Sequence, residues 1–346
     1  MHRSSTLTAG EATGVAAPHD PLAALGRRID AALADWLGAR RAALAAEVPE
    51  ADELVAAVER LTNAGGKRLR PALVEAAWRT AGGEGEPAGA TALGLATELL
   101  HTYLLIHDDI MDHAPLRRGE PTAHELFAGR HRDAALRGDA ADCGVTAAIL
   151  AGDLAHAWAH ELLGHATARL ADAGRRAALA ASFAAMAEEV VAGQYLEVLL
   201  ARRGRATEAE LARVLRLKSG RYSVERPLEL GALYAGADAA LVAALGRCGR
   251  ALGEAFQLQD DLLGTFGAPD EVGKPVASDL AEGKITFLVH HAMAAAPPAD
   301  AERLAGALGS DLDAAAVAEL RRIVEASGAR ATVERMAAER LAAARR

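Results

Sequence analysis

The sequence predicts an all-α protein, and three observations support this fold class. Alanine, leucine, glutamate and arginine outnumber valine, isoleucine, tyrosine and threonine, and the first set favours helix over strand. Apolar residues recur at spacings of three and four, as they do along one face of an amphipathic helix. With 346 residues, 51% of them hydrophobic, the chain can bury a large core. Either one large helical domain or two smaller ones would fit this length.

Charge and cysteine content exclude several classes of protein. The net charge of −9 argues against a nucleic-acid binder, which normally presents a basic surface. Cys143 and Cys248 are too few for a disulfide framework or a zinc site, so we expect a cytoplasmic protein. Because no stretch approaches about 20 uninterrupted apolar residues, we expect no membrane span. Residues 1–20 are small and polar and lack the apolar core of a signal peptide, so we expect a disordered tail.

The first two helices are predicted from an apolar stripe and a stop pattern. The stripe begins after Pro21 and consists of Leu22, Leu25, Ile29, Leu33 and Trp36. A second helix, about residues 50–62, is expected to end at Asn63-Ala64-Gly65-Gly66, which is typical of a helix stop followed by a tight loop.

A basic loop follows this stop. Gly66 lets the backbone approach a ligand closely, and Lys67, Arg68 and Arg70 place three cations within four residues. Arginine binds phosphate through two parallel hydrogen bonds and lysine binds it as a point charge, so the loop fits a diphosphate. A solvated basic loop is the alternative. Pro71 is suited to open the next helix as its first residue.

A long helix, about residues 91–112, follows a Gly/Glu/Pro connector and ends in a cluster of aspartates. Asp108 and Asp112 are four residues apart, so on a helix they lie on one face about 6 Å apart. Carboxylates this close repel each other unless a cation lies between them. Mg²⁺ binds one or two carboxylates and shares the rest of its shell with water and phosphate oxygens. A helix end with unrelated acidic residues is the alternative.

Further helices are predicted from the periodicity at about residues 144–167, 175–200 and 207–217. Between them and the aspartates, Arg117 and Arg118 lie in a Gly/Pro-framed loop that could hold phosphate, and residues 130–142 are expected to form another loop. Residues 193–197 interrupt an apolar pattern and could face a polar cavity. Lys218, followed by Ser219 and Gly220, is interpreted as the end of a helix.

The next long helix, about residues 239–263, ends in a second pair of carboxylates, Asp260 and Asp261. A basic Gly/Pro loop follows it, with Lys274 in Gly273-Lys274-Pro275 and Lys284 after Gly283. The chain therefore carries two acidic helix ends, each followed by a basic loop. Alanine-rich helices are expected from Ile285 to the C-terminus.

Together these motifs resemble the trans-isoprenyl diphosphate synthases, the family of farnesyl and geranylgeranyl diphosphate synthases. The resemblance covers most of the chain from about Leu22, and it rests on five motifs in order: residues 66–71, 108–112, 117–119, 218–219 and 257–284. It implies a single domain at residues 21–346 with the isoprenoid synthase fold, an antiparallel helical bundle around a deep apolar pocket. It also implies a homodimer and a Mg²⁺-dependent prenyltransferase that acts on isoprenoid diphosphates, with three Mg²⁺ ions in each active site.

The resemblance also assigns roles to individual residues. It implies that Mg²⁺ is bound by Asp108, Asp109, Asp112, Asp260 and Asp261. It implies that the allylic diphosphate is neutralised by Arg117, Lys218, Lys274 and Lys284, and that Gln257 points toward the allylic carbons. The diphosphate of isopentenyl diphosphate would be held by Gly66, Lys67, Arg70, His101 and Arg118. One position departs from the family pattern, because Gly264 stands where the second cluster commonly has a third aspartate.

The reaction implied is head-to-tail condensation of isopentenyl diphosphate with dimethylallyl, geranyl or farnesyl diphosphate. Tyr103 lies five residues before Asp108, about 7–8 Å along the helix axis, where a ring would block long tails and the neighbouring Leu104 would block them less. By resemblance, an aromatic residue there and only two residues between Asp109 and Asp112 predict geranylgeranyl diphosphate as the product. Farnesyl diphosphate is the alternative, and Tyr103 could also be an ordinary core residue.

Two other classes of protein would share part of this pattern. A terpene cyclase would keep the metal clusters but would not need the basic loop at residues 66–71 or Arg118. A non-catalytic partner subunit would have lost carboxylates or lysines, and only the carboxylate at position 264 is missing here.

Overall fold

A computed structural model of the chain describes residues 20–267, 278–310 and 312–346. The predicted disordered tail lies outside these residues apart from Asp20, and so does Lys274. The described residues confirm the all-α class, since their only strands form one antiparallel pair of two residues each, β1 (Leu116–Arg117) and β2 (Glu120–Pro121).

The helices occupy most of the described chain. In order, they are α1 (Pro21–Glu47), η1 (Pro49–Ala51), α2 (Asp52–Asn63), α3 (Leu69–Thr80), α4 (Ala88–Met111), α5 (Ala123–Asp133), α6 (Ala140–Thr167), α7 (Ala173–Arg203), α8 (Glu208–Val214), η2 (Leu215–Glu225), α9 (Arg226–Ala235), α10 (Ala239–Phe266), α12 (Ser278–Ala281), α13 (Phe287–Ala295), α14 (Pro298–Ala307), α15 (Ala314–Ala326) and α16 (Ala329–Ala344).

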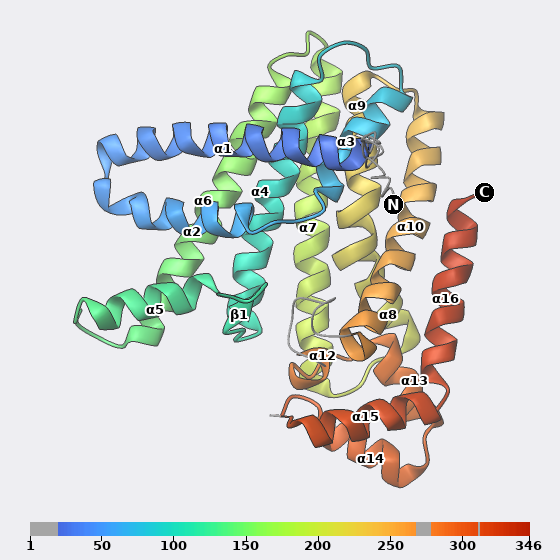
Figure 1. The fold of residues 1–346 in the computed structure, drawn as a ribbon. Helices are drawn as coiled ribbons and strands as arrows, with labels where there is room; N and C mark the ends of the chain where they lie inside the picture. The colour runs from blue at the N-terminus through green and yellow to red at the C-terminus, as the bar shows by residue number, and fades with distance from the viewer. Residues whose placement is uncertain (1–19, 268–277, 311) are drawn as a thin grey trace, which may run out of the picture.

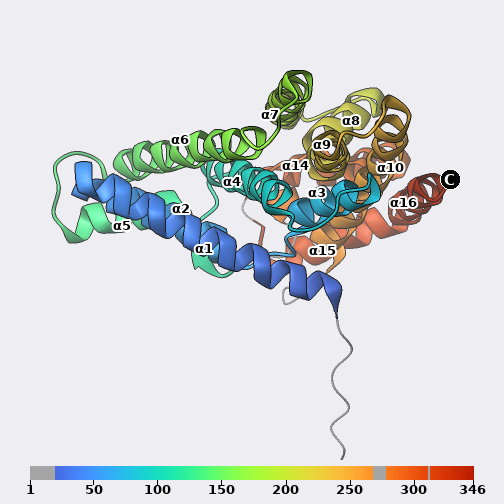
Figure 2. The ribbon, with the colours of Figure 1, turned by 90° about the horizontal axis from the view of Figure 1, so that it is seen from above.

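Helix α4 lies between two groups of helices (Figures 1 and 2). On one side are α1, α2, α5 and α6, and on the other are α8, α9, α10 and α16. Helix α4 packs closely on α6, and α10 packs on η2 and α16. Leu93, Leu99 and Ile106 on α4 are fully buried in the largest hydrophobic cluster. The C-terminal helices form a second cluster around residues such as Leu258 of α10.

Three boundaries differ from the sequence-based expectation. The loop expected at residues 130–142 is shorter, because α5 continues to Asp133 and α6 starts at Ala140. Helix α3 starts at Leu69, before Pro71, and Arg68 precedes it in a left-handed conformation. Lys218 does not end a helix, because the π-helical segment η2 runs through it and continues into α9.

Glycines in η2 and its neighbours explain why Gly220 is not a helix stop. A Cβ on Gly253 of α10 would lie 2.5 Å from the carbonyl oxygen of Gly220, so the two backbones touch at this point. A Cβ on Gly193 of α7 would lie 2.7 Å from the backbone nitrogen of Lys218. Both glycines therefore permit η2 to lie against α7 and α10 at backbone distance, which holds Lys218 in a fixed position.

Among the described helices, α4 alone is long and apolar enough by composition to cross a membrane. Of its most apolar window, 67% is buried inside the protein. Its apolar character is therefore explained by its central position in the bundle.

Candidate active site

A cavity of about 730 Å³ lies where α4, η2 and α10 meet the loop at residues 64–68. Its size is typical of a small-molecule site. The cavity is lined by Asp108 of α4, by Asp260 and Asp261 of α10, and by Lys284. The basic loop also lines it. The two acidic clusters, which are far apart in the sequence, thus contribute to one site.

Each aspartate at the end of α4 is held by a polar partner. Arg117 donates to the buried Asp109 from Nε at 2.7 Å, and its second guanidinium nitrogen lies 3.6 Å from Asp108. Asp108 also accepts a hydrogen bond from Nε2 of Gln194 on α7 at 2.9 Å. Lys284 donates to Asp112 at 2.8 Å. The cations of the site thus partly neutralise its carboxylates.

Two lysines carry their charge in spite of partial burial. Burial opposes protonation of Lys218, but Glu197 and Asp108 raise its pKa above the usual value. Burial likewise opposes protonation of Lys284, and Glu197 and Asp112 raise its pKa well above the usual value. Both lysines are therefore cationic at neutral pH.

The second acidic cluster has a different electrostatic state. Burial, and then the charge of Asp279, raise the pKa of Asp261 to about 8. Gln257 opposes this shift by donating to Asp261 at 2.7 Å. Gln257 and Asp260 also line the cavity. A buried carboxyl surrounded by other carboxylates is suited to a bound cation, which would favour its ionised form.

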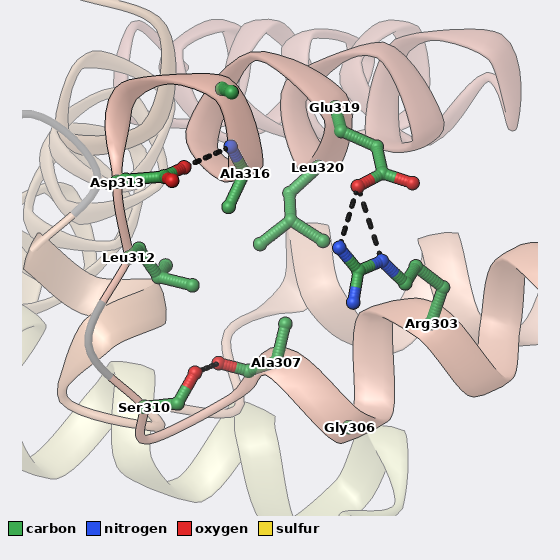
Figure 3. A pocket seen from close by; sticks show the side chains of 10 residues that line it. Arg303, Gly306, Ala307, Ser310, Leu312, Asp313, Ala316, Glu319 and Leu320 are labelled. Carbon is green, nitrogen blue, oxygen red and sulfur yellow. Dashed lines mark hydrogen bonds and ion pairs between the residues drawn. The ribbon is translucent and has the colours of Figure 1, made fainter.

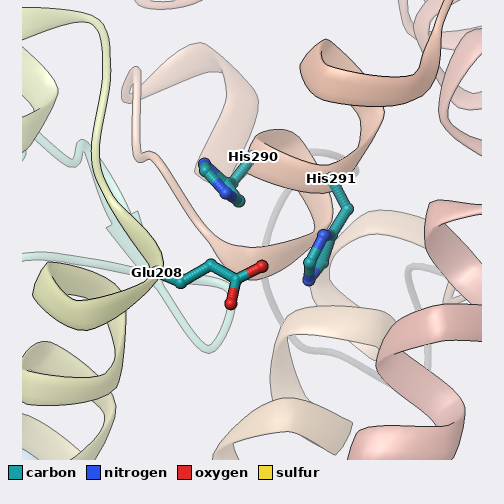
Figure 4. A group of neighbouring side chains, drawn as sticks. All are labelled: Glu208, His290 and His291. Atoms are coloured by element: carbon teal, nitrogen blue, oxygen red, sulfur yellow. The ribbon is translucent and has the colours of Figure 1, made fainter.

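The donor set fits Mg²⁺, because it consists of carboxylate oxygens beside cations that can bind phosphate. Histidine and mixed donors occur elsewhere. Glu208 on α8 and His290 and His291 on α13 place three potential ligand atoms within 4.8 Å of one another (Figure 4). Among the described residues this is the only group of three that close, and it does not line the cavity.

The basic loop forms the other end of the cavity. Gly66, Lys67, Arg70 and Arg118 line it, and Arg118 donates to the carbonyl of Gly65. Arg68 has a structural role: its buried guanidinium pairs with Glu98 at 2.9 Å and with Asp30 at 2.7 Å. All three cations of the loop line the cavity, but the guanidinium of Arg68 is paired within the fold.

His101 is fixed by a contact between α4 and η2. Its Nδ1 lies 2.9 Å from the hydroxyl of Tyr222, and the guanidinium of Arg70 lies over the Tyr222 ring at 4.5 Å from the centroid. Arg70 also donates to Ser223 at 2.9 Å. Burial and the charge of Arg70 lower the pKa of His101 well below the usual value, so this imidazole is neutral.

Tyr103 and Leu104 are not among the residues that line the cavity. The Tyr103 ring stacks on His156 of α6 and meets His107 edge-on, with both centroid distances 4.7 Å. The ring of His156 contacts that of His160, which in turn contacts Phe183 on α7. These rings form a wall across α4, α6 and α7 on another face of α4.

Five residues of the site had not been assigned a role from the sequence: Gln194, Glu197, Tyr222, Ser223 and Asp279. The polar break at residues 193–197 did indicate the first two, and they face the site as expected. No sequence pattern pointed to Tyr222 and Ser223 as site residues, because they lie beyond the helix end that was expected at residues 218–220. Asp279 lies next to a motif that was noted for its lysine alone.

Another hollow lies between α14 and α15, lined by Ser310, Leu312 and Leu320 among others (Figure 3). Arg303 at its edge is paired with Glu319 at 2.9 Å, and Asp313 caps α15 by accepting from Ala316 at 2.8 Å. Its charged groups are thus satisfied by local contacts, and it contains none of the acidic or basic motifs.

Comparison with known proteins agrees with this geometry. Residues 51–326 match the family model for polyprenyl synthetase. The chain is 36% identical over 278 residues to a short chain isoprenyl diphosphate synthase of Methanothermobacter thermautotrophicus, covering 80% of this chain and 78% of the relative. It is 35% identical over 264 residues to a geranylfarnesyl diphosphate synthase of Aeropyrum pernix, covering 76% and 77%.

Among solved structures, a geranylgeranyl pyrophosphate synthase from Corynebacterium glutamicum, complexed with isoprenyl diphosphate and magnesium, is similar with a TM-score of 0.89. The two proteins are 31% identical, and the match covers 93% of this chain and 92% of the other. The similarity therefore extends over nearly the whole bundle.

Proposed function

Since this chain belongs to the polyprenyl synthetase family, and is a short-chain prenyltransferase within it, we propose that it condenses isopentenyl diphosphate with an allylic diphosphate to make geranylgeranyl diphosphate. The observation that carries this proposal is one cavity lined by Asp108 of the first acidic cluster, by Asp260 and Asp261 of the second, and by the basic loop. Such a cavity has one end for a metal-bound diphosphate and another for a second diphosphate.

The allylic diphosphate is proposed to lie at the acidic end. Asp108, Asp109, Asp112, Asp260 and Asp261 would hold Mg²⁺, three ions with diphosphate bound, and the metal would supply neutralising charge to the leaving diphosphate. Lys218, Lys284 and Arg117 now contact these aspartates. On binding they would turn to the phosphate oxygens. Lys274, which lies outside the described residues, is proposed to bind the same diphosphate.

Isopentenyl diphosphate is proposed to lie at the basic end, held by Gly66, Lys67, Arg70, His101 and Arg118. Arg70 is well placed for this role, since Ser223 and the Tyr222 ring fix its orientation. Its buried Nε has no hydrogen-bond partner in the structure. Neutral His101 can contribute a hydrogen bond without adding charge.

The chain's own contribution to the reaction is positioning and electrostatic stabilisation. The C1–O bond of the allylic substrate breaks, and the diphosphate leaves with the electron pair toward Lys218 and Arg117. The double bond of isopentenyl diphosphate then attacks C1, and a proton leaves C2 of the former isopentenyl unit for the departed diphosphate. Gln257 lies in the cavity beside this region.

The length of the product is proposed to depend on Tyr103 and the ring wall. A tail that grows away from Asp108 along α4 would meet Tyr103 only if it reaches the face toward α6, where Tyr103 stacks on His156. Leu104, at the neighbouring position, would narrow the passage. Replacing Tyr103 with alanine would then lengthen the product beyond twenty carbons.

We also propose that the enzyme is a cytoplasmic homodimer. Both cysteines, Cys143 and Cys248, are free. Exposed apolar side chains gather on two neighbouring helices, Ile149 and Leu150 on α6 and Val191 and Tyr195 on α7. A second copy of the chain is the occupant that we propose for this surface.

The experiment is incubation of the purified protein with Mg²⁺, isopentenyl diphosphate and, in turn, dimethylallyl, geranyl and farnesyl diphosphate. Products are dephosphorylated and sized by mass spectrometry. Geranylgeraniol is the expected alcohol, and a longer one is expected from Tyr103→Ala. Farnesol would keep the reaction and overturn the proposed chain length.

Two results would overturn the proposed reaction itself. Free hydrocarbon from an allylic diphosphate alone would indicate a terpene cyclase. Absence of turnover with every primer, in a protein shown to be folded, would indicate a non-catalytic partner subunit.

A further inference from the structure

The second acidic cluster lacks one side chain on the face that carries Asp260. Gly264 lies four residues after Asp260 on α10, so a side chain there would lie beside Asp260 on the same face. The corresponding position in the first cluster, four residues after Asp108, is Asp112. At Gly264 the helix itself therefore contributes no third carboxylate.

Another carboxylate occupies this space. A Cβ built on Gly264 would lie 2.9 Å from Oδ2 of Asp279 and 3.7 Å from its Cγ. Asp279 belongs to α12, the short helix that follows α10 in the described structure, and it lines the same cavity as Asp260 and Asp261. The absence of a side chain at position 264 thus leaves room for the carboxylate of Asp279 beside α10.

The position of Asp279 is fixed by its backbone. The Asp279 carbonyl accepts a hydrogen bond from the backbone of Lys284 at 2.9 Å. The carbonyl of Leu280, which is buried, accepts from Gly309 at 3.0 Å. Asp279 and the cationic Lys284 are therefore held by one turn over the cavity.

On this geometry, we propose that Asp279 supplies the third carboxylate of the second metal site in place of a side chain at position 264, directly or through a water ligand. This inference rests on the proposed function, since it assumes that the cavity binds a divalent cation with a diphosphate. It explains how the chain tolerates glycine at 264.

The test is Mn²⁺ binding to the full-length protein in the presence of inorganic pyrophosphate, followed by electron paramagnetic resonance. Four proteins are compared: wild type, Asp279→Ala, Gly264→Asp and the double variant Gly264→Asp/Asp279→Ala. We expect Asp279→Ala to weaken pyrophosphate-dependent Mn²⁺ binding by about tenfold or more. We expect the double variant to restore most of it. Gly264→Asp alone is the reference for the double variant, because it carries the same added carboxylate.

The outcomes separate this inference from the proposed function. Unchanged Mn²⁺ affinity in Asp279→Ala would overturn the inference. A loss that the double variant does not restore, in a protein with an unchanged melting temperature, would also overturn it, because Asp279 would then act only by holding α12. If Asp279→Ala does not fold, Asp279→Asn takes its place. Wild-type protein that binds no Mn²⁺ with pyrophosphate would instead contradict the proposed function.

A matched control removes the other group of potential ligands. His290→Ala/His291→Ala disrupts the cluster with Glu208 (Figure 4), which lies outside the cavity. We expect this variant to keep its pyrophosphate-dependent Mn²⁺ binding. Its loss would mean that the signal comes from the histidines, and the inference would fail.

Discussion

At the scale of single residues, the site is a set of charges that neutralise one another. Lys218 lies 3.7 Å from Asp108 and also pairs with Glu197, and Arg117 binds Asp109. On the proposed function, these contacts hold the cations where a diphosphate would need them, at little cost of reorganisation. On the proposed function, the same residues would also bind the leaving group.

Lys218 provides a direct test of this view. We expect Lys218→Met to lower kcat by about 10²–10³-fold, because one preorganised cation is lost from the leaving diphosphate. The KM for isopentenyl diphosphate should change little, since that substrate lies at the other end of the cavity. Arg216→Met is the matched control, because Arg216 is exposed and two residues away. Equal losses in both variants would point to a general effect on η2.

His101 makes stability depend on pH. Its pKa in the folded protein lies well below the usual value because of burial and Arg70. Below about pH 6.5 the unfolded chain therefore binds a proton that the folded protein excludes, so this residue lowers the stability as the pH falls. The slope from one such group cannot exceed about 1.4 kcal/mol per pH unit.

The measurement is urea denaturation of wild type and His101→Asn between pH 8 and pH 5. We expect the variant to lose less stability than wild type over the acid half of this range. Parallel curves would show that His101 is protonated in the folded protein, contrary to its contacts with Tyr222 and Arg70.

At the scale of elements, most helices and both acidic helix ends could be predicted from the sequence, whereas the path from α8 to α9 could not. Periodicity located α4 and α10 because their apolar faces repeat regularly over many turns. The π-helical segment η2 interrupts the α-helical periodicity. Residues 218–220 were therefore interpreted as a helix end, although Gly220 allows close contact with Gly253 of α10. Tyr222 was missed for the same reason. Local patterns do not reveal glycines whose role is to let two distant helices touch.

This backbone contact predicts a specific sensitivity. Gly193→Ala would place a Cβ 2.7 Å from the backbone nitrogen of Lys218, so α7 and η2 must move apart. We expect a destabilisation of about 1–3 kcal/mol and a loss of activity of at least tenfold, because Lys218 and Gln194 shift together. Denaturation and steady-state kinetics measure both effects.

Gly164→Ala is the matched control for this change. Gly164 also lies within a helix, α6, but nothing lies within 4 Å of a Cβ built there. This substitution should stabilise the protein by about 0.4–1 kcal/mol. If Gly193→Ala behaves in the same way, η2 is not held by close approach to α7.

At the scale of the whole molecule, the active site and the proposed dimer surface share one helix. Gln194 of α7 points to Asp108, whereas Val191 and Tyr195 on the same helix are 48% and 69% exposed. A second copy that covers Val191 and Tyr195 would also restrain α7 and hence Gln194. Association and catalysis are then coupled through a single helix.

We therefore expect Leu150→Glu/Tyr195→Glu to change both mass and activity. In a two-fold symmetric dimer each substitution occurs twice, so like charges are added on both partners of an interface in an already acidic protein. Sedimentation should give about twice the chain mass of 35.8 kDa for wild type and a single chain for the variant. The variant's kcat should fall several-fold, because α7 loses its outer support.

Leu22→Glu is the control, because it adds charge at an exposed position on α1 and should leave the dimer intact. A variant that sediments like wild type would place the interface elsewhere, and a fully active monomer would show that α7 needs no partner.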